Sequence, residues 1–178
     1  MKYIKDFIRI KKISEKYWKN ITLNNNTYGF QIQRGTKWND GLSENQLIEF
    51  QNNMGFEFPE MLKDYYTVMN GVDKEQINVF GNSGVQYSYS KILYSFPNDI
   101  NIINDLIQWI YKANKINEQD LIKNNISRIF PIFSHRFMLV DHKEHFILSM
   151  HGNDIILFAY NIIDLLNRDL EKKNKRNL

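Results

Sequence analysis

The sequence predicts an α+β domain in which a mainly antiparallel sheet, a meander of short strands, is flanked by helices. Three observations favour this class. The chain has 178 residues, a length typical of one compact domain. Residues 2–69 show mainly helical periodicity, whereas residues 129–158 show strand patterns separated by turn residues. A closing amphipathic segment follows at 160–172, so helices and strands are grouped along the chain rather than alternating.

Composition excludes several kinds of site and indicates a compartment. The chain has no cysteine, which excludes disulfides, thiolate metal sites and cysteine nucleophiles. Lysines and Arg9 interrupt the apolar residues at the start of the chain, so we expect no signal peptide. No apolar run reaches the ~20 residues that span a bilayer. We therefore expect a cytoplasmic protein without a membrane partner.

The formal net charge of +3 is unevenly distributed along the chain. Residues 1–20 carry seven Lys and Arg against two acidic residues, and residues 168–178 carry five against two. The middle, residues 21–167, holds 11 basic and 16 acidic residues. A nucleic-acid binder usually carries a basic stripe on its folded core, and here the basic residues gather at the ends. We therefore expect no nucleic-acid partner.

The start of the chain predicts one helix followed by an irregular stretch. Ile4, Phe7, Ile8 and Tyr17 recur at helical spacing within residues 2–18, and lysines occupy the other face. Residues 21–35 are rich in Asn and Thr, so we expect a loop or a short edge strand there.

The clearest local signal marks a helix that begins after Ser43. Ser43 is a good N-cap, and Gln46 three residues later completes a capping box. Leu42 and Leu47 flank the cap at the spacing of a hydrophobic staple, and Gly55 can end the helix in a left-handed conformation. The apolar face is expected to consist of Leu47, Ile48, Phe50 and Met54.

An extended link and a second helix follow. The residue before proline avoids the helical region, so Phe58 and Pro59 predict a bend between two helices. Asn70 and Gly71 predict the end of the second helix. We expect a side chain to clash at both Gly55 and Gly71, and we expect Trp38 to pack over the staple. The second helix, at about 60–69, is expected to bury Met61, Leu62, Tyr65 and Tyr66.

The remainder of the chain predicts strands, with three helices among them. Strands are predicted over 77–80, 86–93, 129–140, 146–150 and 155–158, and turns over 81–84, 141–144 and 151–154. Pro131 lies near the start of the 129–140 strand, a position that tolerates proline. Helices are predicted over 100–111, from the cap Asn117 to about 124, and over 160–172.

Three stretches occur in a recognisable order: WNDGLSE at 38–44, FPEMLKDYY at 58–66 closing on MNG at 69–71, and IFPIFSHRF at 129–137. Together they resemble the SUKH superfamily, which includes fungal cell-wall-assembly regulators and many bacterial toxin-immunity proteins. The resemblance covers about residues 36–167 of a single expected domain, 1–178, and leaves the helix at 2–18 and the basic tail at 168–178 outside. Its structural motif residues are Trp38, Gly41, Leu42, Ser43, Gly55, Phe58, Pro59, Asn70, Gly71 and Pro131.

The resemblance implies a protein-binding domain that is not an enzyme and that needs no cofactor. In bacteria the implied partner is a toxin domain, often a nuclease, and the small size of this chain fits a bacterial immunity protein. The mechanism would be stoichiometric occlusion of the toxin. An alternative is a regulatory or scaffold module that binds a cellular protein and no toxin. The resemblance leaves the oligomeric state open.

The histidines offer the main chemical alternative, a small metal-dependent enzyme. His142, His145 and His151 lie close together in the sequence, with Asp141 and Asp154 beside them. Their spacing matches no established zinc signature, and turn histidines that contact solvent are the simpler interpretation. Ser134 and His135 are adjacent in a predicted strand, where their side chains would point to opposite faces. We therefore assign no catalytic, metal or cofactor-binding residue.

A partner interface is predicted from chemistry and placement alone. Acidic side chains could imitate substrate phosphates for a basic toxin and speed its association. Tyrosine is enriched among the residues that dominate binding energy. The residues that combine these properties with predicted loop or strand-end positions are Asp73, Glu75, Tyr87, Tyr89 and Asp154.

Overall fold

The computed structural model describes residues 1–24, 29–78 and 88–168. The helices of that part are α1 (Ile4–Trp18), α2 (Glu44–Met54), α3 (Glu60–Val68), α4 (Ile100–Ala113), α5 (Glu118–Lys123) and α6 (Ile162–Leu166). The strands are β1 (Phe30–Gln31), β2 (Gln76–Asn78), β3 (Ser88–Ser90), β4 (Ile129–Phe133), β5 (Arg136–Leu139), β6 (Ile147–His151) and β7 (Asp154–Ala159).

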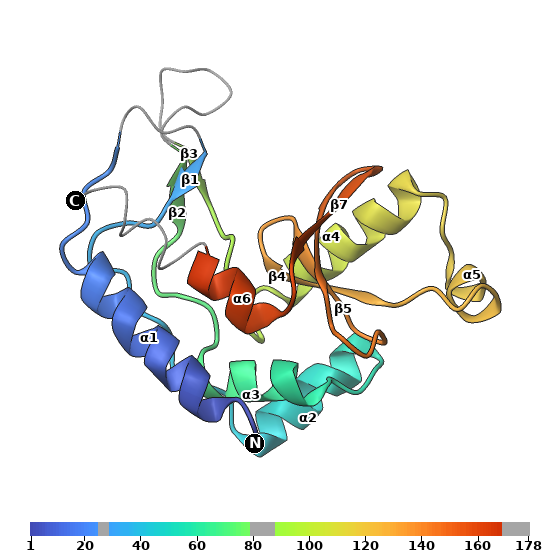
Figure 1. The fold of residues 1–178 in the computed structure, drawn as a ribbon, viewed down its shortest axis with the longest axis horizontal. Helices are drawn as coiled ribbons and strands as arrows, with labels where there is room; N and C mark the ends of the chain where they lie inside the picture. The colour runs from blue at the N-terminus through green and yellow to red at the C-terminus, as the bar shows by residue number, and fades with distance from the viewer. Residues whose placement is uncertain (25–28, 79–87, 169–178) are drawn as a thin grey trace.

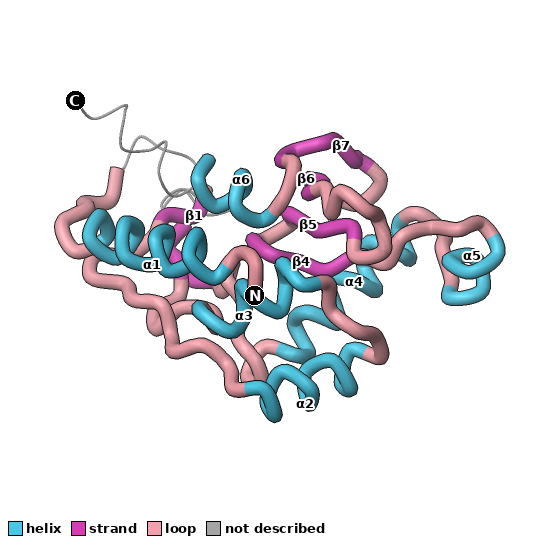
Figure 2. The backbone as a smooth tube through the Cα atoms, turned by 60° about the horizontal axis from the view of Figure 1, so that its bottom comes forward, coloured by secondary structure: helices cyan, strands magenta, loops and turns pink. Residues whose placement is uncertain are grey.

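The strands form two antiparallel sheets, which confirms the α+β class. The smaller sheet has the order β1-β2-β3, and the larger is a meander with the order β4-β5-β6-β7 (Figure 1). Helix α4 lies against β4, α6 lies against β7, and α1 packs on α3 and α6. Figure 2 shows α5 standing apart from the other helices. One hydrophobic cluster runs from Phe7 to Leu166, so α1 belongs to the same core as the 36–167 region.

The predicted helix signals in the first half are confirmed. Ser43 and Gln46 form the capping box, and Gly55 ends α2 with a φ of 73°. A Cβ built on Gly55 would meet no neighbouring atom within 4 Å, so the clash predicted there is wrong. Glycine is favoured at this position because the backbone is left-handed. At Gly71 a Cβ would come within 2.8 Å of the Ser95 Cβ, so the clash predicted there is confirmed.

Two side chains of this half have environments that the sequence alone did not specify. Ile48 is 49% exposed and does not contribute to the buried face of α2. Trp38 packs on α1 and α3, with ring centroids 5.4 Å from Trp18 and 6.4 Å from Tyr65. Its indole N–H donates to Ser14 Oγ at 2.8 Å. A buried indole needs such an acceptor, which α1 supplies.

The predicted single strand over 129–140 is wrong, because the chain folds there into the β4–β5 hairpin. The turn consists of Ser134 and His135, and Ser134 has a φ of 50°. Ser134 N–H donates to the Ile92 carbonyl at 2.7 Å, which supports this uncommon conformation. Pro131 lies in β4, an edge strand, where its missing N–H removes no bond to a second neighbour.

The other predicted elements agree with the structure where it describes them. Asn117 caps α5 through a capping box with Asp120, and β1 is the predicted short edge strand. Helix α6 is described only as far as Leu166, shorter than the predicted 160–172. The predicted turn at 81–84, parts of the strands at 77–80 and 86–93, and the tail from 169 onward lie outside the described residues.

The core is organised around aromatic rings from four segments. Phe50 of α2 stacks on Phe96 with centroids 4.5 Å apart and an interplanar angle of 16°. Phe58, Tyr66 and Phe130 surround Phe50 with ring centroids at 4.9, 5.0 and 5.9 Å. This cluster joins α2, α3, β4 and the 91–99 segment, and ring pairs of this kind add about 0.5–1.5 kcal/mol each beyond the area they bury.

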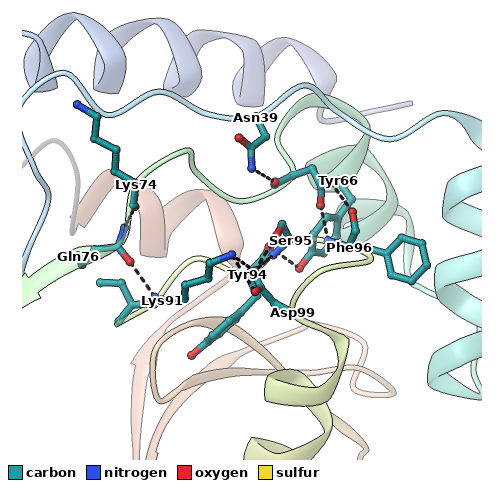
Figure 3. Close-up of polar contacts among 11 residues, drawn as sticks. Asn39, Tyr66, Lys74, Gln76, Lys91, Tyr94, Ser95, Phe96 and Asp99 are labelled. Atoms are coloured by element: carbon teal, nitrogen blue, oxygen red, sulfur yellow. Dashed lines mark hydrogen bonds and ion pairs between the residues drawn. The ribbon is translucent and has the colours of Figure 1, made fainter. Parts of the chain in front are cut away.

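Buried polar groups hold the irregular 91–99 segment inside this core. The Asn70 side chain accepts from the Phe96 N–H at 2.8 Å and donates to the Phe96 carbonyl at 2.7 Å. Figure 3 shows Ser95 and Lys91 converging on Asp99, which accepts the Ser95 N–H at 2.8 Å and the Lys91 ammonium at 2.9 Å. Asn70 thus follows the end of α3, as predicted, and its buried side chain also hydrogen-bonds the Phe96 backbone.

Gly41 provides a first test of the fold, because a Cβ at this position would lie 1.8 Å from the backbone carbonyl oxygen of Thr67. We expect Gly41→Ala to lower the free energy of unfolding by about 3 kcal/mol or more, since backbone of α3 cannot yield as a side-chain tip can. Gly55→Ala, which meets only a conformational penalty, should cost about 1–2 kcal/mol. Urea unfolding of both variants measures the difference, and equal losses would contradict the close approach.

Asn70 provides a second test. In Asn70→Asp the donor to the Phe96 carbonyl is replaced by an oxygen, which leaves a buried acceptor unpaired beside a carboxyl group. We expect a loss of about 3 kcal/mol in the free energy of unfolding. Asn104→Asp, which changes an exposed amide on α4, is the matched control and should change stability by less than about 0.5 kcal/mol. Similar unfolding midpoints for the two variants would show that the Asn70 pair contributes little.

Candidate partner-binding surface

Three adjoining hollows surround the link between α2 and α3, residues 55–60. The smallest, of about 490 Å³, lies over Phe58 and Pro59 and reaches Asp141. The second, of about 630 Å³, shares Glu57 and Lys63 with the first and extends along α2 to Ile48. The third, of about 800 Å³, is lined as follows: Met54, Gly55, Phe56, Asn104, Ile107, Gln108, Tyr111, Leu121, Ile122, Asn125, Ile126, Ser127, Arg128, Ile129, Asp141 and His142. We call the walls of these three hollows the link surface.

Residues at the end of α2 determine the path of the α2–α3 link. Gly55 turns the chain out of α2, and the Gln51 side chain then accepts from the Phe58 N–H at 2.8 Å. Phe58 is buried among the core rings, while Phe56 is only partly buried and reaches the third hollow. Pro59 has a φ of −61° and a ψ of 155°, the extended conformation that starts α3. The link therefore has one aromatic side chain in the core and one at the surface.

An arginine–carboxylate pair forms one wall. The Arg128 guanidinium lies 4.9 Å from the centroid of the Phe56 ring, a cation–π geometry. Its Nε donates to the Asp141 carboxylate at 2.9 Å, and the Arg128 backbone N–H donates to the same carboxylate at 2.8 Å. These bonds from Arg128 hold the pKa of Asp141 below its usual value. Asp141 is therefore ionised at neutral pH and fixes the position of Arg128.

A second ion pair lies at the opposite wall. Lys63 Nζ is 2.6 Å from Glu57 Oε1, and the hydrogen bond from Lys63 lowers the pKa of Glu57. Both this pair and the Arg128–Asp141 pair are exposed to solvent to a large degree. Exposed ion pairs contribute little to stability, so each charge can exchange its present partner for one on a docking molecule at small cost.

The rim of the link surface is apolar. Ile122 on α5 is 86% exposed and Ile48 on α2 is 49% exposed. Because α5 stands apart from the other helices (Figures 1 and 2), Ile122 lies on a projecting element beside the largest hollow. Exposed aliphatic side chains beside a concave region make this surface a candidate contact site for another molecule.

The residues that the sequence proposed for the interface lie elsewhere. Asp73 accepts from the Lys37 N–H at 2.7 Å and its own N–H donates to the Lys37 carbonyl at 3.0 Å, so this residue joins two backbone segments. Glu75 is exposed just before β2, and Tyr89 is exposed in β3 of the smaller sheet. Asp154 begins β7 of the larger sheet, and Tyr87 lies outside the described residues. Of the four that the structure describes, only Tyr89 and Asp154 lie in strands, one in each sheet, and none of the four lines the link surface.

The grouping of the link-surface residues could not be predicted from the sequence. Arg128 and Asp141 are brought together only by the pairing of β4 with β5, and the sequence pattern predicted one continuous strand there. Ile122 belongs to a helix that the cap at Asn117 did predict. Its exposure follows from the distance between α5 and the rest of the fold, which no local pattern encodes.

The three histidines of the metal hypothesis lie at both ends of β6. His145 precedes the strand, with Nδ1 3.3 Å from the Leu139 carbonyl, while His151 ends it, with its ring 5.3 Å from that of Trp109. A strand rises about 3.3 Å per residue, so these two histidines are far apart. His142 lines the third hollow. Among residues 1–24, 29–78 and 88–168, no group of three His, Asp or Glu side chains is arranged to hold a metal ion.

Ser134 and His135 differ from their prediction. They form the β4–β5 turn, so their side chains meet, and Ser134 Oγ lies 3.2 Å from His135 Nδ1. Burial, with smaller contributions from Arg136 and His151, lowers the pKa of His135 to about 4. His135 is therefore neutral at physiological pH.

Comparison of the chain with family models, with curated proteins and with solved structures found no match. In the part of the chain that the structure describes, no helix is both long enough and apolar enough to cross a membrane.

His135 predicts a pH dependence of stability. Its pKa in the folded protein is about 4, against an ordinary value of 6.5, so the unfolded chain binds the proton more readily. Above pH 6.5, protonation of His135 does not lower the free energy of unfolding. As the pH falls from 6.5 towards 4 it lowers that free energy, and below pH 4 the loss levels off. We expect His135→Gln to reduce the loss of urea stability between pH 7 and pH 4.5, whereas Asn104→Gln, an exposed substitution without a titrating group, should not. An unchanged loss in His135→Gln would contradict this assignment.

Proposed function

We propose that this chain is a protein-binding domain that acts as an immunity protein of the SUKH type, binding a cognate toxin domain through the link surface. The observation that carries the protein-binding role is the set of three adjoining hollows bordered by the exposed side chains of Ile48 and Ile122. The toxin as partner rests on the resemblance, whose FPEMLKDYY stretch begins within the same link.

The shape of the link surface suits a convex element of another protein. An apolar anchor from the partner would enter the largest hollow, where Ile107, Tyr111 and Ile126 supply apolar walls. Ile122 would then lose most of its contact with water, and such centrally packed aliphatic and aromatic contacts dominate binding free energy. Arg128, already held by Asp141 and Phe56, offers a positioned donor that needs little reordering on binding.

Charge would favour a basic partner. Because α1 and its lysines belong to the same domain core, a basic partner is favoured by the carboxylates of the link surface rather than by the charge of the whole domain. At the link surface Glu57 and Asp141 are ionised, because Lys63 and Arg128 lower their pKa values. A basic toxin domain, for example a nuclease, would be drawn towards such a surface and could take over these carboxylates. Occlusion of the toxin would follow from stoichiometric binding, with no chemical step.

Co-expression with the toxic domain encoded immediately upstream tests this proposal. We expect wild-type chain to rescue host growth and to co-purify with the toxin. Ile122→Lys should abolish rescue and weaken binding by at least about 30-fold, as expected for a dominant contact. Ile8→Lys is the matched control, since Ile8 is 40% exposed on α1, and it should rescue as well as wild type.

The outcomes separate the parts of the proposal. Host death despite abundant folded wild-type chain would overturn the immunity role and favour a regulatory module that binds a cellular protein. Rescue by wild type and by Ile122→Lys alike would retain the immunity role and overturn the link surface as its site.

A further inference from the structure

Strand β7 is an unprotected edge of the larger sheet. It is last in the order β4-β5-β6-β7, so among the described residues only β6 pairs with it. Ile155, Ile156 and Leu157 are 41, 59 and 56% exposed. Proteins usually protect an edge with charges, proline or a covering element, because unpaired backbone groups recruit another strand. Three successive exposed aliphatic residues at such an edge form an apolar surface that is available to a further strand.

The opposite edge of the same sheet is protected. In β4, Pro131 removes one N–H group, and residues 129–132 are buried. From Ile155 to Ala159, β7 contains neither proline nor a charged residue. The register irregularity between Ile147 and Leu148 affects only the far end of β7, beyond the exposed aliphatic residues. One edge strand of this sheet, β4, is therefore buried and contains a proline, whereas the other, β7, has exposed aliphatic side chains and no proline.

The backbone of β7 fixes how a further strand can pair. Gly152 and Asn153 form a two-residue turn, and His151 is opposite Asp154. Such a turn closes on a hydrogen-bonded pair, and the pairs then alternate. Asp154 and Ile156 therefore direct their backbone groups towards β6. Ile155 and Leu157 direct their N–H and C=O groups outward, available to a strand on the other side.

We propose that a second copy of this chain pairs its β7 antiparallel with the first, which joins the two larger sheets across a twofold axis. The outward backbone groups allow the register that best matches the exposed aliphatic residues, with Ile155 opposite Leu157 of the second copy and Ile156 opposite Ile156 of the second copy. Each exposed aliphatic side chain then meets another, and the same residues serve on both sides, as a twofold interface requires. This inference goes beyond the proposed function and uses a different surface.

The charges at the ends of β7 favour a second copy of this chain as the partner that pairs with this strand. In this register Asp154 lies opposite Phe158 of the second copy. The Phe158 carbonyl accepts from Arg168 at 2.6 Å, and the Arg136 guanidinium lies 4.1 Å from the Phe158 ring centroid. Each exposed Asp154 would thus meet a site flanked by two guanidinium groups, one of which also bonds Asp164. The two Asp154 carboxylates lie at opposite ends of the interface, so like charges do not meet.

The size of this contact sets its strength. One six-residue strand, with the exposed Tyr160 beside it, forms a smaller interface than the roughly 1,200–2,000 Å² of a stable complex. We therefore expect a reversible dimer with a dissociation constant in the micromolar range, detected as a concentration-dependent mass by sedimentation equilibrium of the full chain. Ile156→Lys, which would oppose two lysines on the twofold axis, should weaken it at least about 30-fold. Ile122→Lys, on the link surface, should leave it unchanged.

Because the chain has no cysteine, single substitutions can test the register. Opposed residues in a non-hydrogen-bonded antiparallel pair have Cα atoms about 4.5 Å apart, within disulfide range. We expect Ile156→Cys to form a cross-linked dimer on mild oxidation, and Ile155→Cys and Ile122→Cys to form far less. A monomer at every concentration, or equal cross-linking of all three variants, would overturn the proposal. Because Ile156→Cys leaves the link surface intact, its toxin rescue reports separately on the proposed function.

Discussion

The bidentate pair between the Asn70 side chain and the Phe96 backbone is the constraint on which the rest of the structure depends. An asparagine side chain has an NH2 group that donates and a carbonyl oxygen that accepts, which match the C=O and N–H groups of Phe96. The backbone N–H and C=O groups of Phe96 are therefore paired inside the core, where unpaired groups would be costly. Asp99 completes the arrangement by binding Ser95 and Lys91.

The position of the candidate surface follows from this constraint. Once the backbone of Phe96 is held, its ring stacks on Phe50, and Phe50 in turn contacts Phe58 and Phe130. These contacts bring the α2–α3 link against the start of the larger sheet. Phe56, on the other side of the link, is then left beside Arg128 at the surface. The hollows thus lie next to the aromatic cluster of the core.

The sequence predicted those features that depend on a few neighbouring residues. The Ser43 capping box, the left-handed Gly55 and the Asn117 cap are contacts within three or four positions, and all three are present. The β4–β5 turn was missed because Ser134 and His135 lie within an apolar run and include no Gly, Asn or Asp, the residues that mark two-residue hairpin turns. The link surface could not be predicted, because the Arg128–Asp141 pair exists only through that missed hairpin.

The same asymmetric packing accounts for both exposed surfaces. Phe130 ties β4 to the aromatic cluster, so the helices of the first half gather at that edge and enclose it. At the other edge α6 follows β7 directly, and of the β7 side chains only Ala159 is fully buried. The link surface, reached through Arg128 and Asp141, adjoins the β4–β5 side, whereas Ile156 lies at the far edge. A partner on one surface and a second copy on the other would not compete, and a dimer would present two link surfaces at once.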